Sequence, residues 1–215
     1  MVFNINDLDW EKKVVEPDVV LSKIEPGMSI FLGTGVAEPR TLVKRLMSSD
    51  MINLHDLELV QLVSLGHAIS FSNQSNRRKL RLKTFFSGWV ADDAIRSGSI
   101  DLIPTRFCRI PKLIERGVIR IDVSFIQITP PDRAGYSSLG VSVDIAKHAM
   151  EKSAIVVGEI NDQVPRTMGN TFVHVSEFDY LIKATEPPIY FPRWPTTDVF
   201  DRLAANVASV VEDGS

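Results

Sequence analysis

The feature that most restricts the fold is an uninterrupted β-prone run at residues 121–129, which reads IDVSFIQIT. A strand buried on both faces reads as a nearly continuous apolar run, whereas a strand covered on one face alternates apolar and polar residues. Other short runs occupy residues 28–32, 57–63, 80–86, 100–103 and 154–160, and helical patterns such as residues 143–152 lie between runs. This alternation predicts an α/β fold with a mostly parallel sheet covered by helices.

The composition is that of an ordinary globular protein. Of the 215 residues, 24 are basic and 27 acidic, the net charge is −3, and 44% of the residues are hydrophobic. The only basic cluster lies at residues 77–83, so we expect no nucleic-acid partner. No stretch reaches the roughly 18 apolar residues of a membrane span, and the first ten residues do not resemble a signal peptide. We therefore expect no membrane partner either.

The chain contains a single cysteine, Cys108. One cysteine excludes an intrachain disulfide and a multi-cysteine zinc site, and it is typical of a reducing compartment, so we predict a cytoplasmic location. The segment around Cys108 leads into a helix, and we expect its thiol to be half-buried. The four histidines are scattered along the sequence, and no spacing suggests a metal site.

Residues 1–186 are predicted to form one α/β domain, and residues 187–215 a proline-rich linker with a terminal helix. Four of the twelve prolines lie at residues 187–195. Beyond them, Thr197 or Asp198 can cap a helix with apolar residues at helical spacing, and Asp213-Gly214 is a stop signal. No internal repeat is apparent.

A glycine-containing turn at residues 33–39 is the first candidate site. Gly33, Thr34, Gly35 and Glu38 lie between a predicted strand and a predicted helix, where backbone N–H groups can approach an anionic or carbonyl oxygen. Glu38 stands where a dinucleotide-binding loop has its third glycine, so we exclude NAD. The structural alternative is a tight turn in which Glu38 complements the helix dipole.

A second candidate site follows the central strand. Its polar and small residues are Gln127, Pro131, Gly135, Ser138, Gly140 and Ser142. The carboxyl ends of parallel strands are where α/β sheets bind ligands. Ser138 has neither the nucleophile-elbow sequence nor an evident histidine base, so it is not assigned as a nucleophile.

Four segments carry a resemblance to a known family. They are residues 30–39 (IFLGTGVAEP), 122–132 (DVSFIQITPPD), 135–144 (GYSSLGVSVD) and 164–176 (VPRTMGNTFVHVS). In this order they resemble the acetyl-CoA hydrolase/transferase family, and the similarity extends from about residue 20 to residue 214. The resemblance implies coenzyme A as a substrate, acyl-CoA and carboxylate partners, and no metal.

The resemblance also implies that this chain is an amino-terminal half. Family members are about twice as long and consist of two related α/β halves, and the glutamate that forms a glutamyl-CoA thioester lies in the carboxyl-terminal half. No catalytic residue is therefore assigned here, and the isolated chain is expected to be inactive. The glycine turn and the residues from Gln127 to Ser142 are expected to line the substrate pocket. A homodimer is plausible by the same similarity.

Three questions stay open at this stage. The sequence does not name the acyl group, and it does not distinguish CoA transfer from acyl-CoA hydrolysis. Alternatives to the enzyme half are a non-catalytic binding or assembly module and a subunit of a split CoA-transferase. A sugar-phosphate isomerase of similar architecture would need an acid–base pair and a phosphate grip that the sequence does not show.

Overall fold

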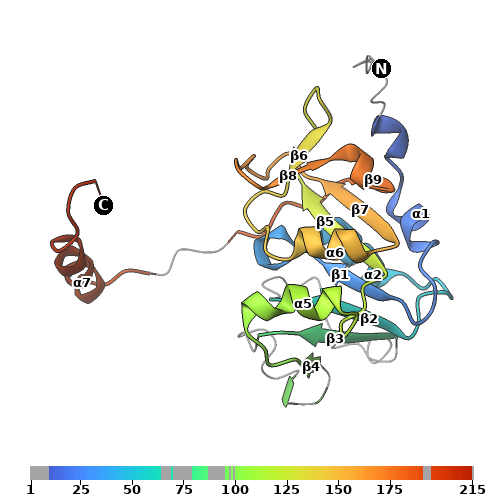
Figure 1. The fold of residues 1–215 in the computed structure, drawn as a ribbon, viewed down its shortest axis with the longest axis horizontal. Helices are drawn as coiled ribbons and strands as arrows, with labels where there is room; N and C mark the ends of the chain where they lie inside the picture. The colour runs from blue at the N-terminus through green and yellow to red at the C-terminus, as the bar shows by residue number, and fades with distance from the viewer. Residues whose placement is uncertain are drawn as a thin grey trace.

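The computed structural model describes residues 10–63, 69, 79–86, 95, 96, 98, 100–190 and 195–214. Seven strands in this part of the chain form one sheet in the order β4-β3-β2-β1-β5-β7-β9, and every neighbouring pair is parallel (Figure 1). The strands are β1 (Ser29–Leu32), β2 (Leu57–Gln61), β3 (Leu80–Thr84), β4 (Ile100–Leu102), β5 (Val123–Ile128), β7 (Ile155–Ile160) and β9 (Tyr180–Lys183). The predicted parallel α/β architecture is confirmed.

Strand β5 is the centre of this sheet, as its sequence predicts. All six of its residues are buried, and it pairs with β1 on one side and β7 on the other, with Phe125 opposite Leu32 and Val157. The chain winds from β1 to β4 in one direction and from β5 to β9 in the other. The strand order therefore reverses between β1 and β5, which is the position where sheets of this kind form a ligand crevice.

Helices cover the two faces of the sheet. On one face α1 (Pro17–Leu21) and α2 (Arg40–Ser48) pack with Ile30 and Leu32 in one apolar cluster. On the other face α5 (Ile110–Glu115) and α6 (Ala146–Lys152) pack with Phe31. The alternate residues of β1 thus supply both cores, which explains why this strand has no polar face.

Several elements differ from the sequence prediction. Strand β9 and the antiparallel pair β6 (Tyr136–Ser138) and β8 (Phe172–His174) were not predicted as such, whereas α5 is the helix expected after Cys108. Four single 3-10 turns complete the described elements: η2 (Trp10–Lys13), η3 (Gly35–Ala37), η4 (Phe107–Arg109) and η5 (Val175–Glu177). The expectation of a half-buried thiol is wrong, because Cys108 is exposed on η4.

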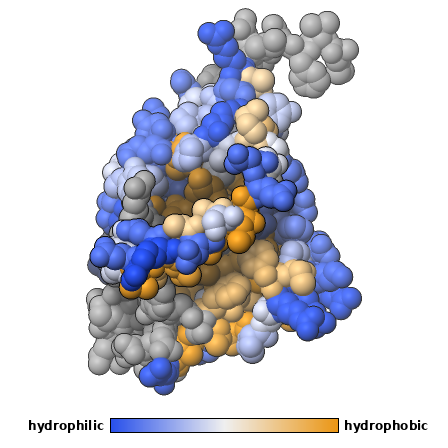
Figure 2. All heavy atoms as spheres, turned by 90° about the vertical axis from the view of Figure 1, so that its left-hand side faces the viewer, coloured by the Kyte–Doolittle hydropathy of each residue, from blue (hydrophilic) through white to orange (hydrophobic). Residues whose placement is uncertain are grey.

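The predicted terminal helix is present as α7 (Asp198–Ala208), and it stands apart from the sheet in Figure 1. None of its residues is buried. Its large apolar side chains are more than half exposed, namely Val199, Phe200, Leu203 and Val207, with Val210 and Val211 beyond it. Figure 2 faces this side of the molecule and shows apolar side chains gathered in the middle of the view. Among the described helices, none is long and apolar enough to cross a bilayer.

The ends of α1 and α7 share a short repeated motif. This motif corrects the sequence-based expectation of no internal repeat. Ser22 and Ser209 end the two helices with nearly identical backbone angles, φ −68°, ψ −15° and φ −67°, ψ −16°. Each serine hydroxyl donates to the carbonyl three residues earlier, at 2.7 and 2.8 Å. Gly27 and Gly214 then follow at the same spacing, with φ of 78° and 87°. The turn that leads into β1 is therefore formed a second time at residues 209–214.

Gly158 lies where β7 packs closely against its neighbours, so a substitution there tests this packing. A Cβ atom at this position would lie 2.7 Å from Leu181 Cδ2 and 3.0 Å from both Ile128 Cδ1 and Phe178 Cδ1. We expect Gly158→Ala to lower the free energy of unfolding by about 1–3 kcal/mol through overpacking. Urea unfolding would measure it, with Ala154→Ser at an exposed position as a control expected within about 0.5 kcal/mol of the parent. An unchanged Gly158→Ala would contradict this packing.

Candidate functional site

The two candidate loops leave the sheet at one edge. The glycine turn follows the carboxyl end of β1, Gln127 lies near the carboxyl end of the adjacent parallel strand β5, and the Gly33 N–H donates to the Phe125 carbonyl at 3.0 Å. A Cβ atom on Gly33 would lie 2.4 Å from the Ala37 carbonyl oxygen, so only glycine allows the chain to turn back this tightly. The structure therefore brings the first loop and Gln127 to the point where the strand order reverses.

Buried amide side chains fix this edge. Gln61 Nε2, at the end of β2, donates to the Gly33 carbonyl at 3.1 Å and to Glu38 Oε2 at 3.2 Å. Gln127 Nε2 donates to the Val36 carbonyl at 3.3 Å, and Gln127 Oε1 accepts from Asn161 Nδ2 at 3.1 Å. The three amides are at most 3% exposed. They hold the loop after β1 against the ends of β2, β5 and β7.

Glu159, inside β7, holds the start of α2. Its carboxylate oxygens accept the backbone N–H groups of Thr41 at 3.2 Å and Leu42 at 3.0 Å. Glu38 is also fully buried, but the helix N-terminus is capped by Glu159. Glu159 therefore satisfies N–H groups at the start of α2, a role that was not assigned to it from the sequence.

The environment of Glu159 changes its titration. Burial raises the pKa of this carboxyl to about 7, against the opposing effect of the Leu42 and Thr41 N–H groups, and the nearby Glu38 carboxyl raises the pKa further. A carboxyl in a low-dielectric site favours its neutral form. Glu159 therefore changes charge near neutral pH at the base of the candidate site.

Asp144 fixes the end of the second loop. It adopts φ +29°, which is uncommon outside glycine, and its carboxylate accepts the Ile145 N–H and the Ser142 hydroxyl. Burial raises the pKa of Asp144, while hydrogen bonds from Ile145 and Ser142 oppose the rise. Ser142, which was predicted for the site, is thus held by a residue that the prediction did not include.

A cleft of about 190 Å³ opens at this edge. The side chains around it are apolar or uncharged: Val36, Ala37, Gln127, Val141, Gln163, Val164, Pro165, Pro188, Ile189 and Tyr190. The cleft lies beside Gly140, where φ is +69° and a Cβ atom would lie 2.4 Å from Val164 Cγ1. No serine, cysteine, lysine, histidine or carboxylate is among these described lining residues, so the cleft can hold a small group but offers it no nucleophile.

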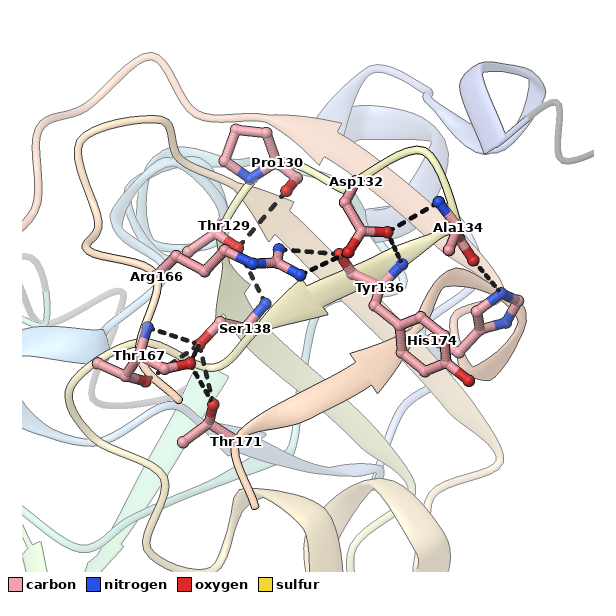
Figure 3. A network of polar contacts seen from close by, with 10 residues as sticks. All are labelled: Thr129, Pro130, Asp132, Ala134, Tyr136, Ser138, Arg166, Thr167, Thr171 and His174. Atoms are coloured by element: carbon pink, nitrogen blue, oxygen red, sulfur yellow. Dashed lines mark hydrogen bonds and ion pairs between the residues drawn. The ribbon is translucent and has the colours of Figure 1, made fainter. Parts of the chain in front are cut away.

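The remaining predicted residues lie in a separate polar network around β6 and β8 (Figure 3). Ser138 is fully buried, and its Oγ bonds Thr167 Oγ1 and Thr171 Oγ1, both at 3.1 Å. Gly135 lies in the turn where its N–H donates to the Asp132 carbonyl at 2.9 Å, and Pro131 precedes that turn. None of these three residues lines the cleft.

Arg166 belongs to the same network. Its guanidinium donates to Asp132 Oδ2 at 2.6 Å and to the Tyr136 carbonyl at 3.0 Å, and it lies 4.8 Å from the centre of the Phe172 ring (Figure 3). The Tyr136 and Ala134 N–H groups, together with Arg166, hold the pKa of Asp132 below its usual range. This arginine is therefore used to fix the β6–β8 pair.

Sequence reasoning missed Gln61, Asn161, Glu159 and Asp144. Glu159 gave a usable signal, because it is the one charged residue in the otherwise apolar run IVVGEI. A carboxylate in a buried strand needs donors from another element. Within the described residues, no group of three or more histidine, cysteine or acidic side chains could hold a metal ion.

A comparison with known families gives one match. The model of the acetyl-CoA hydrolase/transferase N-terminal domain matches residues 5–191. This range includes both loops and the whole seven-stranded sheet.

Curated relatives match nearly all of this chain, but the match covers only part of each relative's own length. The chain is 34% identical over 212 residues to a 4-hydroxybutyrate coenzyme A transferase of Clostridium kluyveri, covering 97% of this chain and 49% of that protein. It is 30% identical over 200 residues to a succinyl-CoA:acetate/propanoyl-CoA:succinate CoA transferase of Fasciola hepatica, covering 92% and 41%. The chain thus spans less than half the length of these relatives.

Solved structures share the fold. RipA from Yersinia pestis superposes with a TM-score of 0.81 at 23% identity, covering 95% of this chain and 50% of that chain. A 4-hydroxybutyrate CoA-transferase from Porphyromonas gingivalis gives a TM-score of 0.67 at 23% identity, covering 96% and 47%. A chain of the decarboxylase AibA/AibB gives a TM-score of 0.55 at 13% identity, covering 91% and 92%.

The raised pKa of Glu159 predicts a specific pH dependence of stability. Its usual pKa is 4.5, so folding takes up a proton at pH values between 4.5 and about 7. The stabilisation is complete below pH 4.5 and is lost as the pH rises through about 7, a change of about 3 kcal/mol in the free energy of unfolding. In Glu159→Gln, whose amide imitates the protonated carboxyl, this part of the pH dependence should disappear.

Urea unfolding of both proteins between pH 4.5 and 8 makes the measurement. The difference between the two curves isolates Glu159, because all other groups titrate in both proteins. Glu151→Gln, at an exposed position on α6, should follow the parent. Parallel curves for the parent and Glu159→Gln would show that Glu159 is ionised throughout this range.

Proposed function

The chain belongs to the acetyl-CoA hydrolase/transferase family as its amino-terminal domain, and from that premise we propose that it forms one wall of an acyl-CoA site completed by a second α/β half. The observation that carries this proposal is the cleft itself. The glycine turn, Gln127 and the loop around Gly140 meet at the point where the strand order reverses, yet the described lining residues include no nucleophile. A reactive carboxylate supplied from outside this wall would complete it.

The proposed reaction divides its parts between the two halves. A glutamate of the second half attacks the acyl-CoA carbonyl and displaces the CoA thiolate, which gives a mixed anhydride. The thiolate then attacks the glutamyl carbonyl, so that the free carboxylic acid leaves and a glutamyl-CoA thioester remains. An acceptor carboxylate reverses these steps and departs as a new acyl-CoA, whereas water in its place gives hydrolysis. This chain would hold and orient the acyl group.

The exposed apolar side chains of α7 support the proposal that a second half exists. Val20, Leu21 and Ile24 of the first repeat are at most 1% exposed under the sheet. The corresponding residues of the second copy are Val207, Ala208 and Val211, and the two valines are more than half exposed. A turn of the same geometry leads into β1 after Gly27. We propose that α7 covers a sheet of the second half as α1 covers this one.

The second half can lie on the same polypeptide or on a partner subunit. The relatives are more than twice as long as the matched part, which favours one polypeptide. The AibA/AibB chain, of which this chain covers 92%, favours a separate subunit, because there the fold occupies nearly a whole chain. Either arrangement gives the same two-walled site, and a homodimer of complete units is compatible with both.

The activity of the two halves is the direct test of this proposal. Acetyl-CoA and propionate would be incubated with this chain alone, with the second half alone, and with both halves together. Formation of propionyl-CoA, followed by chromatography, is expected only with both halves. Sustained exchange by this chain alone would contradict the proposal.

The exposed face of α7 gives a second test. We expect Leu203→Asp and Val207→Asp to leave the free energy of unfolding of this domain within about 0.5 kcal/mol, because neither side chain is buried here. The same substitutions should lower the activity of the two-half enzyme at least about tenfold, since a buried carboxylate without a partner disrupts packing. Asn206→Asp, on the same helix, is the matched control. Unfolding of this domain by either α7 variant would show that the helix packs on the domain itself.

A further inference from the structure

The cleft carries information about the acyl group that the family resemblance does not. Its polar side chains are uncharged: Gln127 on its floor, and Gln163 and Tyr190 near its mouth. Both polar atoms of the Gln127 amide bond protein groups, namely the Val36 carbonyl and Asn161. Gln163 is exposed, and only its Oε1 is engaged, by a long bond of 3.4 Å from the Tyr190 hydroxyl. Gln163 is therefore an exposed polar side chain whose amide N–H groups are available to a ligand.

Two described arginines that lie close to the lining segments in sequence, Arg40 and Arg166, are bonded elsewhere. Arg40 donates to the Pro187 carbonyl at 2.9 Å and lies 4.0 Å from Glu186, whose carboxylate also binds Lys44 at 2.6 Å. Arg166 is held by Asp132 and by the Tyr136 carbonyl. Among the described lining residues there is no cation. The described part of this wall thus offers no cation to pair with a negatively charged acyl tail.

Resting on the function proposed above, we propose that this cleft accepts a short, uncharged acyl chain and that Gln163 determines this specificity. The apolar walls formed by Val36, Val141 and Val164 contact the methylene groups. The Gln163 amide donates a hydrogen bond to a neutral oxygen at the end of the chain. The volume of about 190 Å³ is below the roughly 300 Å³ at which clefts begin to hold drug-sized ligands, so it suits an acyl tail.

The physical basis is the difference between burying a hydroxyl and burying a carboxylate. A hydroxyl group needs one hydrogen-bond partner, which an amide supplies, whereas a carboxylate that leaves water needs a cation or several donors. A succinyl group would place its free carboxylate against this neutral wall. We therefore expect the acyl specificity of this chain to differ from that of the Fasciola hepatica relative, whose name includes succinyl-CoA.

The experiment measures kcat/KM for CoA transfer to acetate by the complete two-half enzyme. Three donors are compared: butyryl-CoA, 4-hydroxybutyryl-CoA and succinyl-CoA. Both uncharged donors should exceed succinyl-CoA at least about tenfold. Gln163→Arg, which offers a guanidinium to the tail carboxylate, should raise the ratio of succinyl-CoA to butyryl-CoA about tenfold. Gln163→Leu should lower the ratio of 4-hydroxybutyryl-CoA to butyryl-CoA several-fold, because the donor for the hydroxyl is lost.

A control variant and two contrary outcomes complete this experiment. Val118→Arg adds the same charge at a 68% exposed position before the amino end of β5, at the opposite edge of the sheet, and should leave all three ratios unchanged. The proposed specificity would be overturned if the parent enzyme preferred succinyl-CoA. It would also be overturned if folded Gln163→Arg left the ratio of kcat/KM for succinyl-CoA to that for butyryl-CoA unchanged. Either result would leave the transferase function intact. Absence of transfer from all three donors would overturn the proposed function, and the specificity with it.

Discussion

The candidate site depends on the carboxylate of Glu159. It reaches from β7 to the N–H groups of Thr41 and Leu42, the second and third residues of α2, at 3.2 and 3.0 Å. The Thr41 hydroxyl in turn accepts from the N–H groups of Thr185 and Glu186 after β9. These contacts fix where α2 begins, and the glycine turn that precedes α2 is fixed with it. A buried carboxylate is costly unless its lone pairs find donors, so one interaction ties the stability of the domain to the position of the loop. The site is rigid on the side of this chain because its supporting groups are buried.

The sheet could be predicted from sequence because burial on both faces leaves a direct mark on composition. All six residues of β5 and five of the six in β7 are buried, and both runs are mainly apolar, so neither run can be a surface element. The strands β6 and β8 escaped prediction for a physical reason. β6 and β8 have three residues each and are stabilised by Ser138, Thr167 and Thr171, which come from distant parts of the chain. No local pattern records such a contact.

The site was predictable in position but only partly in its residues. The carboxyl edge of a parallel sheet and a glycine turn located Gly33 and Gln127. Ser138, by contrast, lies in the chain between two candidate residues but turns its hydroxyl into the β6–β8 network. The second loop was treated as one unit, yet its first part forms a two-stranded ribbon, and only Val141, beside Gly140, returns to the cleft. Sequence order alone cannot show where a loop folds back.

The cleft and α7 lead to the same central claim: this chain orients the acyl group, and the carboxylate that reacts belongs to the second half. Mass spectrometry of the complete enzyme, digested after reaction with acyl-CoA and reductive trapping by borohydride, tests this directly. A thioester intermediate becomes an alcohol on one glutamate, which lowers the mass of its peptide by about 14 Da. The account predicts this change on a glutamate of the second half and an unmodified peptide set from residues 1–215. A modified glutamate in this chain, above all Glu38 or Glu159, would contradict it.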